Sequence, residues 1–160
     1  MENNKLIAEF LEFEKVKFLN GCYTFIIPDY LSHGEYKNLT LEDDREVVAW
    51  DVENLIFHKD WNWLMKVVEK INTIDEDRFT VQIFSMDTYI YDSKDRNFII
   101  KTELTYNPDE LIKSVYNTCV KFIKWYNSHL CANCGRFDDV VGTHSITICE
   151  ECALNNTSYG

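Results

Sequence analysis

Glycine and proline are scarce in this sequence, with five glycines and two prolines among 160 residues. We find no glycine-rich or proline-rich stretch that would act as a linker, no low-complexity segment and no internal repeat. Hydrophobic residues make up 46% of the chain, which is enough apolar surface to support a packed core. We therefore expect one sizeable domain with a small docked module rather than several tethered domains.

Positive charge is also in short supply, since 16 basic residues face 27 acidic ones and the formal net charge is −11. Such a chain repels the phosphate backbone wherever positive charge is not concentrated locally. Direct nucleic-acid binding is therefore disfavoured. It would require one of two groups of lysines to gather on one face, namely Lys5, Lys15 and Lys17 or Lys113, Lys121 and Lys124.

Long apolar runs are missing as well. No segment approaches the roughly 18 continuous apolar residues that a membrane span needs. The polar opening of residues 1–4 lacks the basic and apolar pattern of a signal peptide. We expect a cytoplasmic protein. In that reducing compartment the six cysteines are better interpreted as metal ligands or buried thiols than as disulfides.

Four of the cysteines form two C-x2-C pairs separated by the 14 residues from Gly135 to Ile148. This spacing is close to that of tetrahedral zinc sites, because one tight turn can present two sulfurs to one ion. Gly135 can adopt the positive φ that such a turn often requires. We predict one structural Zn²⁺, with no open position for a catalytic water, held by Cys131, Cys134, Cys149 and Cys152.

Three alternatives to this zinc site stay open. The sulfurs could hold iron or act as a redox pair, they could be unliganded thiols, or His144 could replace one cysteine. The spacer suits a hairpin whose strands are residues 140–141 and 145–148. The remaining cysteines, Cys22 and Cys119, are interpreted as buried apolar groups.

Hydrophobic periodicity predicts helices at three places in the chain. A short helix is expected over 5–14, where Asn4 could cap the first turn. A second helix over 61–71 follows the good N-cap Asp60, and its apolar stripe is Trp61, Leu64, Val68 and Ile71. A third helix of about 22 residues begins at Asn107 and is expected to lie across a sheet.

The expected sheet lies between the second and third helices. Three β-rich stretches at 79–83, 88–91 and 98–102 are joined by short polar turns, which favours an antiparallel meander. An earlier strand at 23–27 ends at Pro28, and the acidic sequence from there to Asp51 is interpreted as loop.

The fold class that follows is α+β. Residues 1–130 are expected to form a domain in which helices pack on a small antiparallel sheet. Residues 131–160 are expected to form a zinc-ribbon or knuckle-like module.

Two features are candidates for partner binding. Trp61 and Trp63 offer large contact areas, but residues two apart do not share a helix face, so one should be core and the other exposed. The acidic residues Asp43 and Asp44 could contact a basic partner, although solvated loops are the simpler interpretation of acidic stretches.

Motifs for catalysis are weak. His33 and Glu35 match half of the zinc deaminase pattern, but Leu130 stands where that pattern has proline, and the second cysteine pair already completes the metal shell. Asp29, Glu35 and Lys37 faintly match metal-dependent nucleases, with too few residues between them for the usual strand pair. We expect a protein that is not an enzyme, the alternative being an active site assembled from distant loops.

The segments 58–71 (HKDWNWLMKVVEKI) and 120–127 (VKFIKWYN) resemble small uncharacterised proteins of bacteriophages and related mobile elements. The resemblance covers about half of the chain, implies no established activity and transfers no functional residues. Together with the negative charge, it leads us to expect a protein that blocks a host nucleic-acid-handling or defence enzyme by occupying its basic channel.

The alternative function is that of a nucleic-acid-binding zinc-ribbon protein. The basic residues available for it in the tail are few, because Arg136 stands alone against Asp138, Asp139, Glu150 and Glu151.

Overall fold

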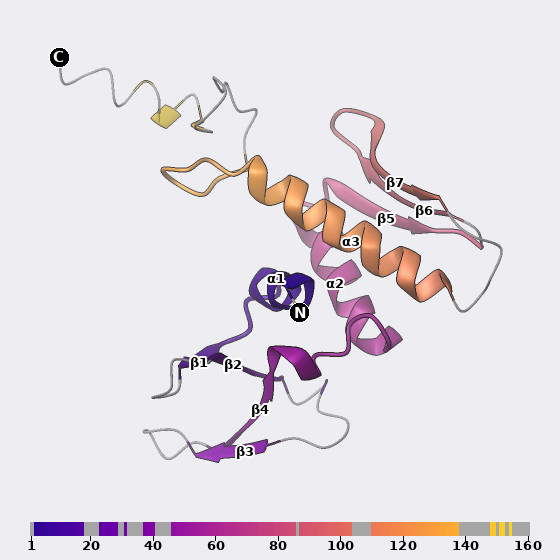
Figure 1. The fold of residues 1–160 in the computed structure, drawn as a ribbon. Coiled ribbons are helices and arrows are strands. Elements are labelled where there is room, and N and C mark those ends of the chain that lie inside the picture. The colour runs from indigo at the N-terminus through magenta and orange to yellow at the C-terminus, as the bar shows by residue number, and fades with distance from the viewer. Residues whose placement is uncertain are drawn as a thin grey trace. The chain divides into compact units, whose positions relative to one another are not determined.

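The structure is a computed structural model that describes residues 2–17, 23–28, 31, 37–40, 46–85, 87–103, 110–137, 148–149, 151–152 and 154. The chain divides into two compact units, Met1–Val120 and Lys121–Gly160. The division lies inside helix α3 (Leu111–Ser128), so the second unit contains the end of that helix as well as the cysteine-bearing tail. The expected α+β class is confirmed, with two small antiparallel sheets in place of one (Figure 1).

The first sheet has the strand order β1-β2-β4-β3, and every pair is antiparallel. Its strands are β1 (Lys15–Lys17), β2 (Tyr23–Ile26), β3 (Lys37–Thr40) and β4 (Glu46–Asp51). The prediction of strand β2 is therefore confirmed, whereas the prediction of loop up to Asp51 is wrong where β3 and β4 lie. The apolar run Val47–Trp50 suits a strand, but the acidic residues around it obscured that pattern.

Helix α1 (Glu2–Phe10) begins and ends earlier than expected. Asn4 lies inside this helix instead of capping it, and its buried side chain joins two other segments. Its Nδ2 donates to the carbonyl oxygen of Leu55 at 2.7 Å, and its Oδ1 accepts from the hydroxyl of Tyr116 at 3.0 Å. The position of α1 is thus specified by tertiary hydrogen bonds that sequence periodicity cannot reveal.

Helix α2 (Trp61–Thr73) begins where the sequence predicts, because the Asp60 side chain accepts hydrogen bonds from the backbone N–H groups of Asn62 at 2.8 Å and Trp63 at 3.2 Å. Its buried face comprises Trp63, Leu64, Val67, Val68 and Ile71. The predicted stripe is therefore right for Leu64, Val68 and Ile71 and wrong for Trp61, which is 40% exposed.

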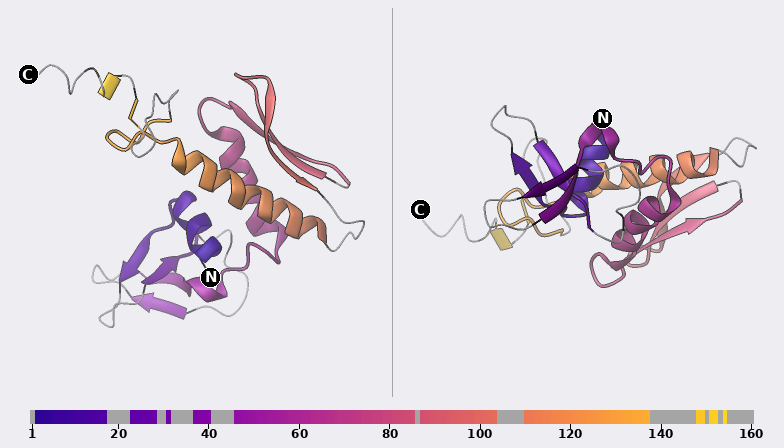
Figure 2. Two further views of the ribbon diagram at one scale, coloured as in Figure 1. Left: turned by 45° about the horizontal axis from the view of Figure 1, so that its top comes forward. Right: turned by 90° about the horizontal axis from the view of Figure 1, so that it is seen from below.

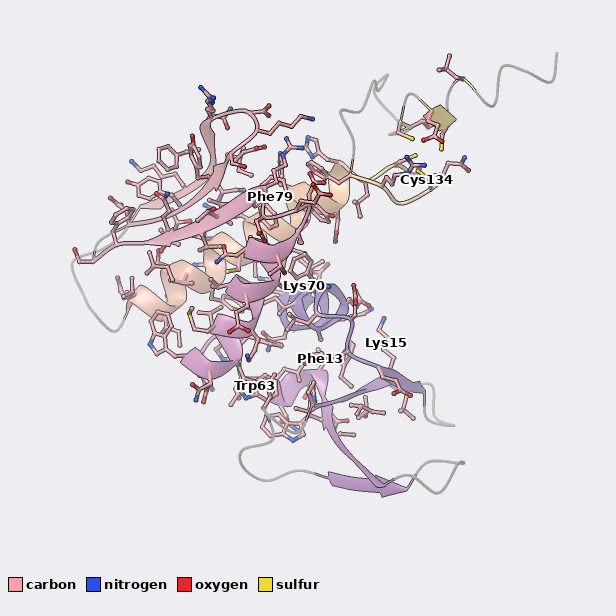
Figure 3. All side chains as sticks on the ribbon, turned by 180° about the vertical axis from the view of Figure 1, so that it is seen from behind. Phe13, Lys15, Trp63, Lys70, Phe79 and Cys134 are labelled. Atoms are coloured by element: carbon pink, nitrogen blue, oxygen red, sulfur yellow. The ribbon has the colours of Figure 1, made fainter. Side chains whose placement is uncertain are left out.

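An aromatic cluster joins α2 to the first sheet. Trp63 stacks on Trp50 of β4 with ring centroids 5.0 Å apart and meets Phe57 edge to face at 5.1 Å. Phe57 in turn contacts Phe13 at 6.2 Å, and Figure 3 labels Phe13 and Trp63 in this region. In the chain, the short helix η2 (Val52–Asn54) lies between Trp50 and Phe57. This packing makes Trp63 a core residue of the first unit.

The second sheet is the predicted meander, with β5 (Phe79–Ile83), β6 (Asp87–Asp92) and β7 (Asn97–Glu103) in that order. Along β6, Thr88, Ile90 and Asp92 are buried and alternate with partly exposed residues. The buried face packs beside α2, where Asn72 Oδ1 accepts from the backbone N–H of Val81 at 2.8 Å (Figure 2). One face of the meander is thus covered and the other faces outward.

A buried ion pair ties the start of β5 to the end of β6. Arg78 Nε lies 3.0 Å from Asp92 Oδ1, and Arg78 Nη2 lies 2.7 Å from Asp92 Oδ2. Asp92 also accepts the backbone N–H groups of Lys94 and Asp95. Burial alone would raise the pKa of the Asp92 carboxyl, but the hydrogen bonds from Arg78 and the two amides outweigh it and hold that pKa below its ordinary value.

The turn before Arg78 is strained. Asp75, Glu76 and Asp77 have φ values of 53°, 55° and 62°, a left-handed conformation that costs an L-residue roughly 1–2 kcal/mol. The Arg78 backbone N–H closes this turn on the carbonyl oxygen of Ile74 at 3.2 Å. We infer that the buried pair, which anchors the Arg78 side chain, stabilises the turn against its own backbone preference.

Replacing Asp92 by asparagine should lower the free energy of unfolding by about 3–5 kcal/mol, because it leaves the Arg78 charge buried without its partner. Urea unfolding followed by circular dichroism measures this. The control is Asp95→Asn: that carboxylate is exposed, lies 3.5 Å from Arg78, and should contribute less than about 1 kcal/mol.

The same pair predicts a pH dependence. Because the folded pKa of Asp92 is lowered, its stabilisation is complete above the unfolded pKa of about 3.9 and is lost as the pH falls through the lower folded pKa. The stability difference between the wild type and Asp92→Asn should therefore shrink below about pH 4. A difference that stays constant down to acid unfolding would contradict this.

Candidate metal centre

The four cysteines of the two C-x2-C pairs converge in the structure. The Sγ atoms of Cys131, Cys134, Cys149 and Cys152 all lie within 4.8 Å of one another, and those of Cys134 and Cys149 are 3.6 Å apart. Metal–sulfur bonds of about 2.3 Å in a tetrahedron place neighbouring sulfurs about 3.8 Å apart. The cluster could therefore hold one metal ion, and its donors and distances are consistent with zinc.

The first cysteine pair lies on a tight turn at the end of α3. The Gly135 backbone N–H donates to the carbonyl oxygen of Cys131 at 2.8 Å, and the Cys131 N–H donates to that of Arg136 at 2.8 Å. A β-bridge between Leu130 and Phe137 closes the turn. Gly135 has a φ of +71°, as expected from the sequence, and this left-handed conformation lets the chain turn back directly after Cys134.

The second pair approaches the first from a distant part of the sequence. The backbone N–H of Cys149 donates to Cys131 Sγ at 3.3 Å, which directly links the two pairs. Cys131, Cys149 and Cys152 are buried and pack with Ile148, whereas Cys134 is exposed. Most of the cluster is thus shielded from water, as a site that stabilises structure requires.

Hydrogen bonds and burial shift the thiol pKa values in opposite directions. Backbone N–H groups, first that of Cys149, point at the Cys131 sulfur and lower its pKa to about 6. For Cys149, the backbone hydrogen bond from Cys152 lowers the pKa, but burial and hydrogen bonds among the thiols outweigh it and raise the pKa to about 12. One thiolate is thus favoured, and a bound dication would supply the charge that further deprotonation needs.

The metal-binding turn packs on aromatic residues at the end of α3. The Phe137 ring stacks on that of Tyr126 with centroids 4.9 Å apart and lies 5.5 Å from that of Trp125. Across the cluster, Arg136 Nη1 lies 2.7 Å from Glu151 Oε2, an exposed ion pair that contributes little to stability. Sequence reasoning did not assign these roles, although the aromatic residues at both ends of the turn were a usable signal.

The other predicted site residues differ in their exposure, and some of them lie outside the described residues. Trp61 is exposed and can contact a partner, whereas Trp63 has 0% exposure, which removes it from the partner-binding candidates. Asp43, Asp44, Cys22, His144 and the spacer hairpin, apart from Ile148, lie outside the described residues. Cys119 is a buried thiol, as predicted, and is not one of the four clustered cysteines; burial raises its pKa to about 12.

Comparisons with known proteins identify no relative of this chain. No family model, curated protein or solved structure matches the chain. The resemblance to phage proteins therefore stays a prediction. Within the described residues, no helix has both the length and the apolar character needed to cross a membrane.

Protein purified in reducing buffer should carry about one metal ion per chain, because one tetrahedral site has four sulfur donors. Elemental analysis after gel filtration measures the stoichiometry. Cys149→Ser should lose the metal, whereas the matched control Cys119→Ala, a buried cysteine outside the cluster, should keep it. Metal-free wild type, or full metal content in Cys149→Ser, would remove this site.

Gly135→Ala should weaken metal binding through the backbone alone. A Cβ at this position meets no atom within 4 Å, so no clash arises. The left-handed conformation costs alanine about 1–2 kcal/mol, which corresponds to roughly tenfold weaker binding. Competition with a chelator measures the change, and Gly135→Asn should lose less, because asparagine tolerates positive φ. Equal losses in both variants would argue against the backbone explanation.

Proposed function

We propose that this chain is a non-catalytic, acidic protein-binding module whose C-terminal unit is stabilised by one structural zinc ion. The observation that carries the proposal is the closed cluster of four sulfur donors, which fills every tetrahedral position. A catalytic zinc site keeps one position open for water or substrate, and this donor set offers none. The cluster is therefore better suited to holding the end of the chain in shape than to performing chemistry.

Zinc is favoured over the alternatives by the chemistry of the cluster. The Cys134 and Cys149 sulfurs are 3.6 Å apart, far beyond the roughly 2.05 Å of a disulfide bond. Four thiolates in a tetrahedron suit Zn²⁺ or iron, and zinc is the usual ion of closed structural C-x2-C sites. Elemental analysis distinguishes the two metals.

Two properties support protein binding. The chain carries a net charge of −11, which favours basic partners. Helix α2 also exposes two large apolar side chains one turn apart, Trp61 and Met65, at 40% and 38%. Exposed tryptophan and methionine are typical of contact surfaces. Asp43 and Asp44 remain sequence-based candidates for the acidic part of such a surface.

A finer proposal concerns the partner. The resemblance to phage and mobile-element proteins, together with the acidic charge, supports an inhibitor of a host nucleic-acid-handling or defence enzyme. Negative charge on a small folded protein can occupy the basic channel where the phosphate backbone of a nucleic acid normally lies. The host cytoplasm would be the site of action.

A second candidate function is nucleic-acid binding. Lys121 and Lys124 are exposed and lie one turn apart on α3, which is the beginning of a basic stripe. In the same unit, Arg136 is already paired with Glu151, so the positive charge available for phosphates is small.

Affinity capture with the tagged full chain from the host lysate, followed by an inhibition assay on the purified captured protein, tests the main proposal. Trp61→Ser combined with Met65→Ser should weaken the interaction by about tenfold or more, because it removes two apolar contacts. The control Asn62→Ser changes an exposed polar residue on the same helix and should have little effect. Reversing Asp43 and Asp44 to lysine tests the acidic contribution.

A different set of results would favour nucleic-acid binding over protein binding. If no captured protein is bound directly or inhibited, and single-stranded or double-stranded DNA or RNA instead binds tightly and with strong salt dependence, the second candidate is favoured. Loss of that binding in Lys121→Glu with Lys124→Glu would then place it on α3.

A further inference from the structure

The outward face of the β5–β7 meander is aromatic. Phe84, Tyr89, Tyr91 and Phe98 lie on it, and we call these four residues the aromatic face. Phe84 and Phe98 are 54% and 57% exposed, the largest exposures among the described phenylalanines, and the two tyrosines are partly exposed. Four such rings on a sheet of three short strands form a contact surface rather than scattered surface residues.

The rings form one continuous strip. The Phe84 and Tyr89 centroids are 5.9 Å apart, those of Tyr89 and Phe98 are 5.2 Å apart, and those of Tyr91 and Phe98 are 5.4 Å apart. The strip therefore runs from the residue that follows β5 across β6 to β7. The opposite face supplies the core, with Ile90 buried and Thr102 bonded to Thr118 of α3 at 2.6 Å. One face of the sheet thus contributes to the core, whereas the other leaves its rings exposed.

One ring of the strip already holds a cation. The Lys101 ammonium lies 5.4 Å from the centroid of the Tyr89 ring, within the range of a cation–π interaction. The Tyr89 hydroxyl donates to Asp87 Oδ2 at 2.9 Å, which places a carboxylate at the margin of the same ring. The face thus offers positive groups both aromatic surface and negative charge.

Negative charge also gathers where β6 ends and β5 begins. The Arg78 guanidinium is shared by the carboxylates of Asp75, Asp92 and Asp95 at 3.5, 2.7 and 3.5 Å. Glu76 and Asp77 are exposed beside them on the strained turn. Tyr91 and Asp92 point to opposite faces of β6, so one end of the aromatic face lies near this turn but does not share the buried carboxylate, and the exposed residues after β6 include the basic Lys94 and Arg96 as well as Asp95.

We propose that the aromatic face docks an arginine-rich segment of a protein partner. This rests on the proposed function and assigns it a surface and a partner chemistry. Guanidinium groups are planar, stack on aromatic rings and pair with carboxylates, so one arginine can use both features of this surface. Lysine forms weaker contacts of this kind because its ammonium is compact and strongly hydrated.

Charge disfavours the other occupants of this face. Stacked nucleic-acid bases need positive charge beside the rings for the phosphates, and the charge of Lys101 on this face is opposed by Asp87 and by Glu76 and Asp77 of the adjoining turn. A second copy of the chain would bring the same acidic turn and a net charge of −11 to the contact. A cationic protein segment meets neither objection.

The test measures the anisotropy of a fluorescently labelled peptide of alternating arginine and glycine, titrated with the full-length, metal-loaded protein. The wild type should bind this peptide at least threefold more tightly than the matched lysine–glycine peptide. Phe84→Ser combined with Phe98→Ser should weaken binding about tenfold, because it removes two exposed rings. The control Leu154→Ser removes an exposed apolar side chain that belongs neither to the sheet nor to α2 and should bind normally.

Several results would overturn the proposal. Equal affinity for the arginine and lysine peptides would show general charge attraction, and this comparison needs no variant. Unchanged binding by a folded Phe84→Ser and Phe98→Ser protein would place the contact elsewhere. Tighter binding of oligothymidine than of the peptide would indicate a nucleic-acid surface, and a dimer abolished by the double variant would indicate self-association.

The outcome is separable from that of the proposed function. If the captured partner binds the phenylalanine double variant as well as the wild type, the aromatic face is excluded while protein binding stands. If the wild type binds and inhibits no partner, the proposed function fails whatever the peptide result. Circular dichroism and metal content establish that the variant is folded.

Discussion

The second unit depends on the convergence of four sulfur atoms. In its described part, Cys131, Cys149 and Cys152 with Ile148 form the buried cluster around which the tail is organised. So small a set of apolar groups cannot offset the entropy lost by ordering the chain, and metal binding would supply the missing free energy. The stacking of Phe137 on Tyr126 then joins the turn that carries Cys131 and Cys134 to the end of α3.

The first unit is stabilised differently, by aromatic packing and one buried ion pair. Trp50 and Trp63 join the first sheet to α2. The ion pair of Arg78 with Asp92 joins the start of β5 to the end of β6. Among the described residues, the indole nitrogens of these two tryptophans have no hydrogen-bond partner, so apolar contact and not polar pairing explains their burial. Each unit thus has its own source of stability.

Features set by short-range chemistry could be predicted from the sequence. The cap at Asp60, the meander and the positive φ of Gly135 follow from neighbours along the chain, and the cysteine spacing identified the cluster before any coordinates. Features set by distant contacts could not. The direction of Trp61, the strand β4 and the buried role of Asn4 each depend on partners far away in the sequence.

The exposure of the aromatic face is another feature that the sequence alone could not predict. Tyr89 and Tyr91 alternate with Thr88 and Ile90, so the sequence alone reveals a two-sided strand. Only the packing of α2 and the bond from Thr118 to Thr102 decide which side is covered. The rings on the other side stabilise the strand pairing through their cross-strand contacts, and their exposure also makes them accessible to a partner. Four cysteines that would leave no coordination position for water, together with an exposed aromatic sheet face opposite the core, are the two features on which the proposal of a protein that acts by contact rests.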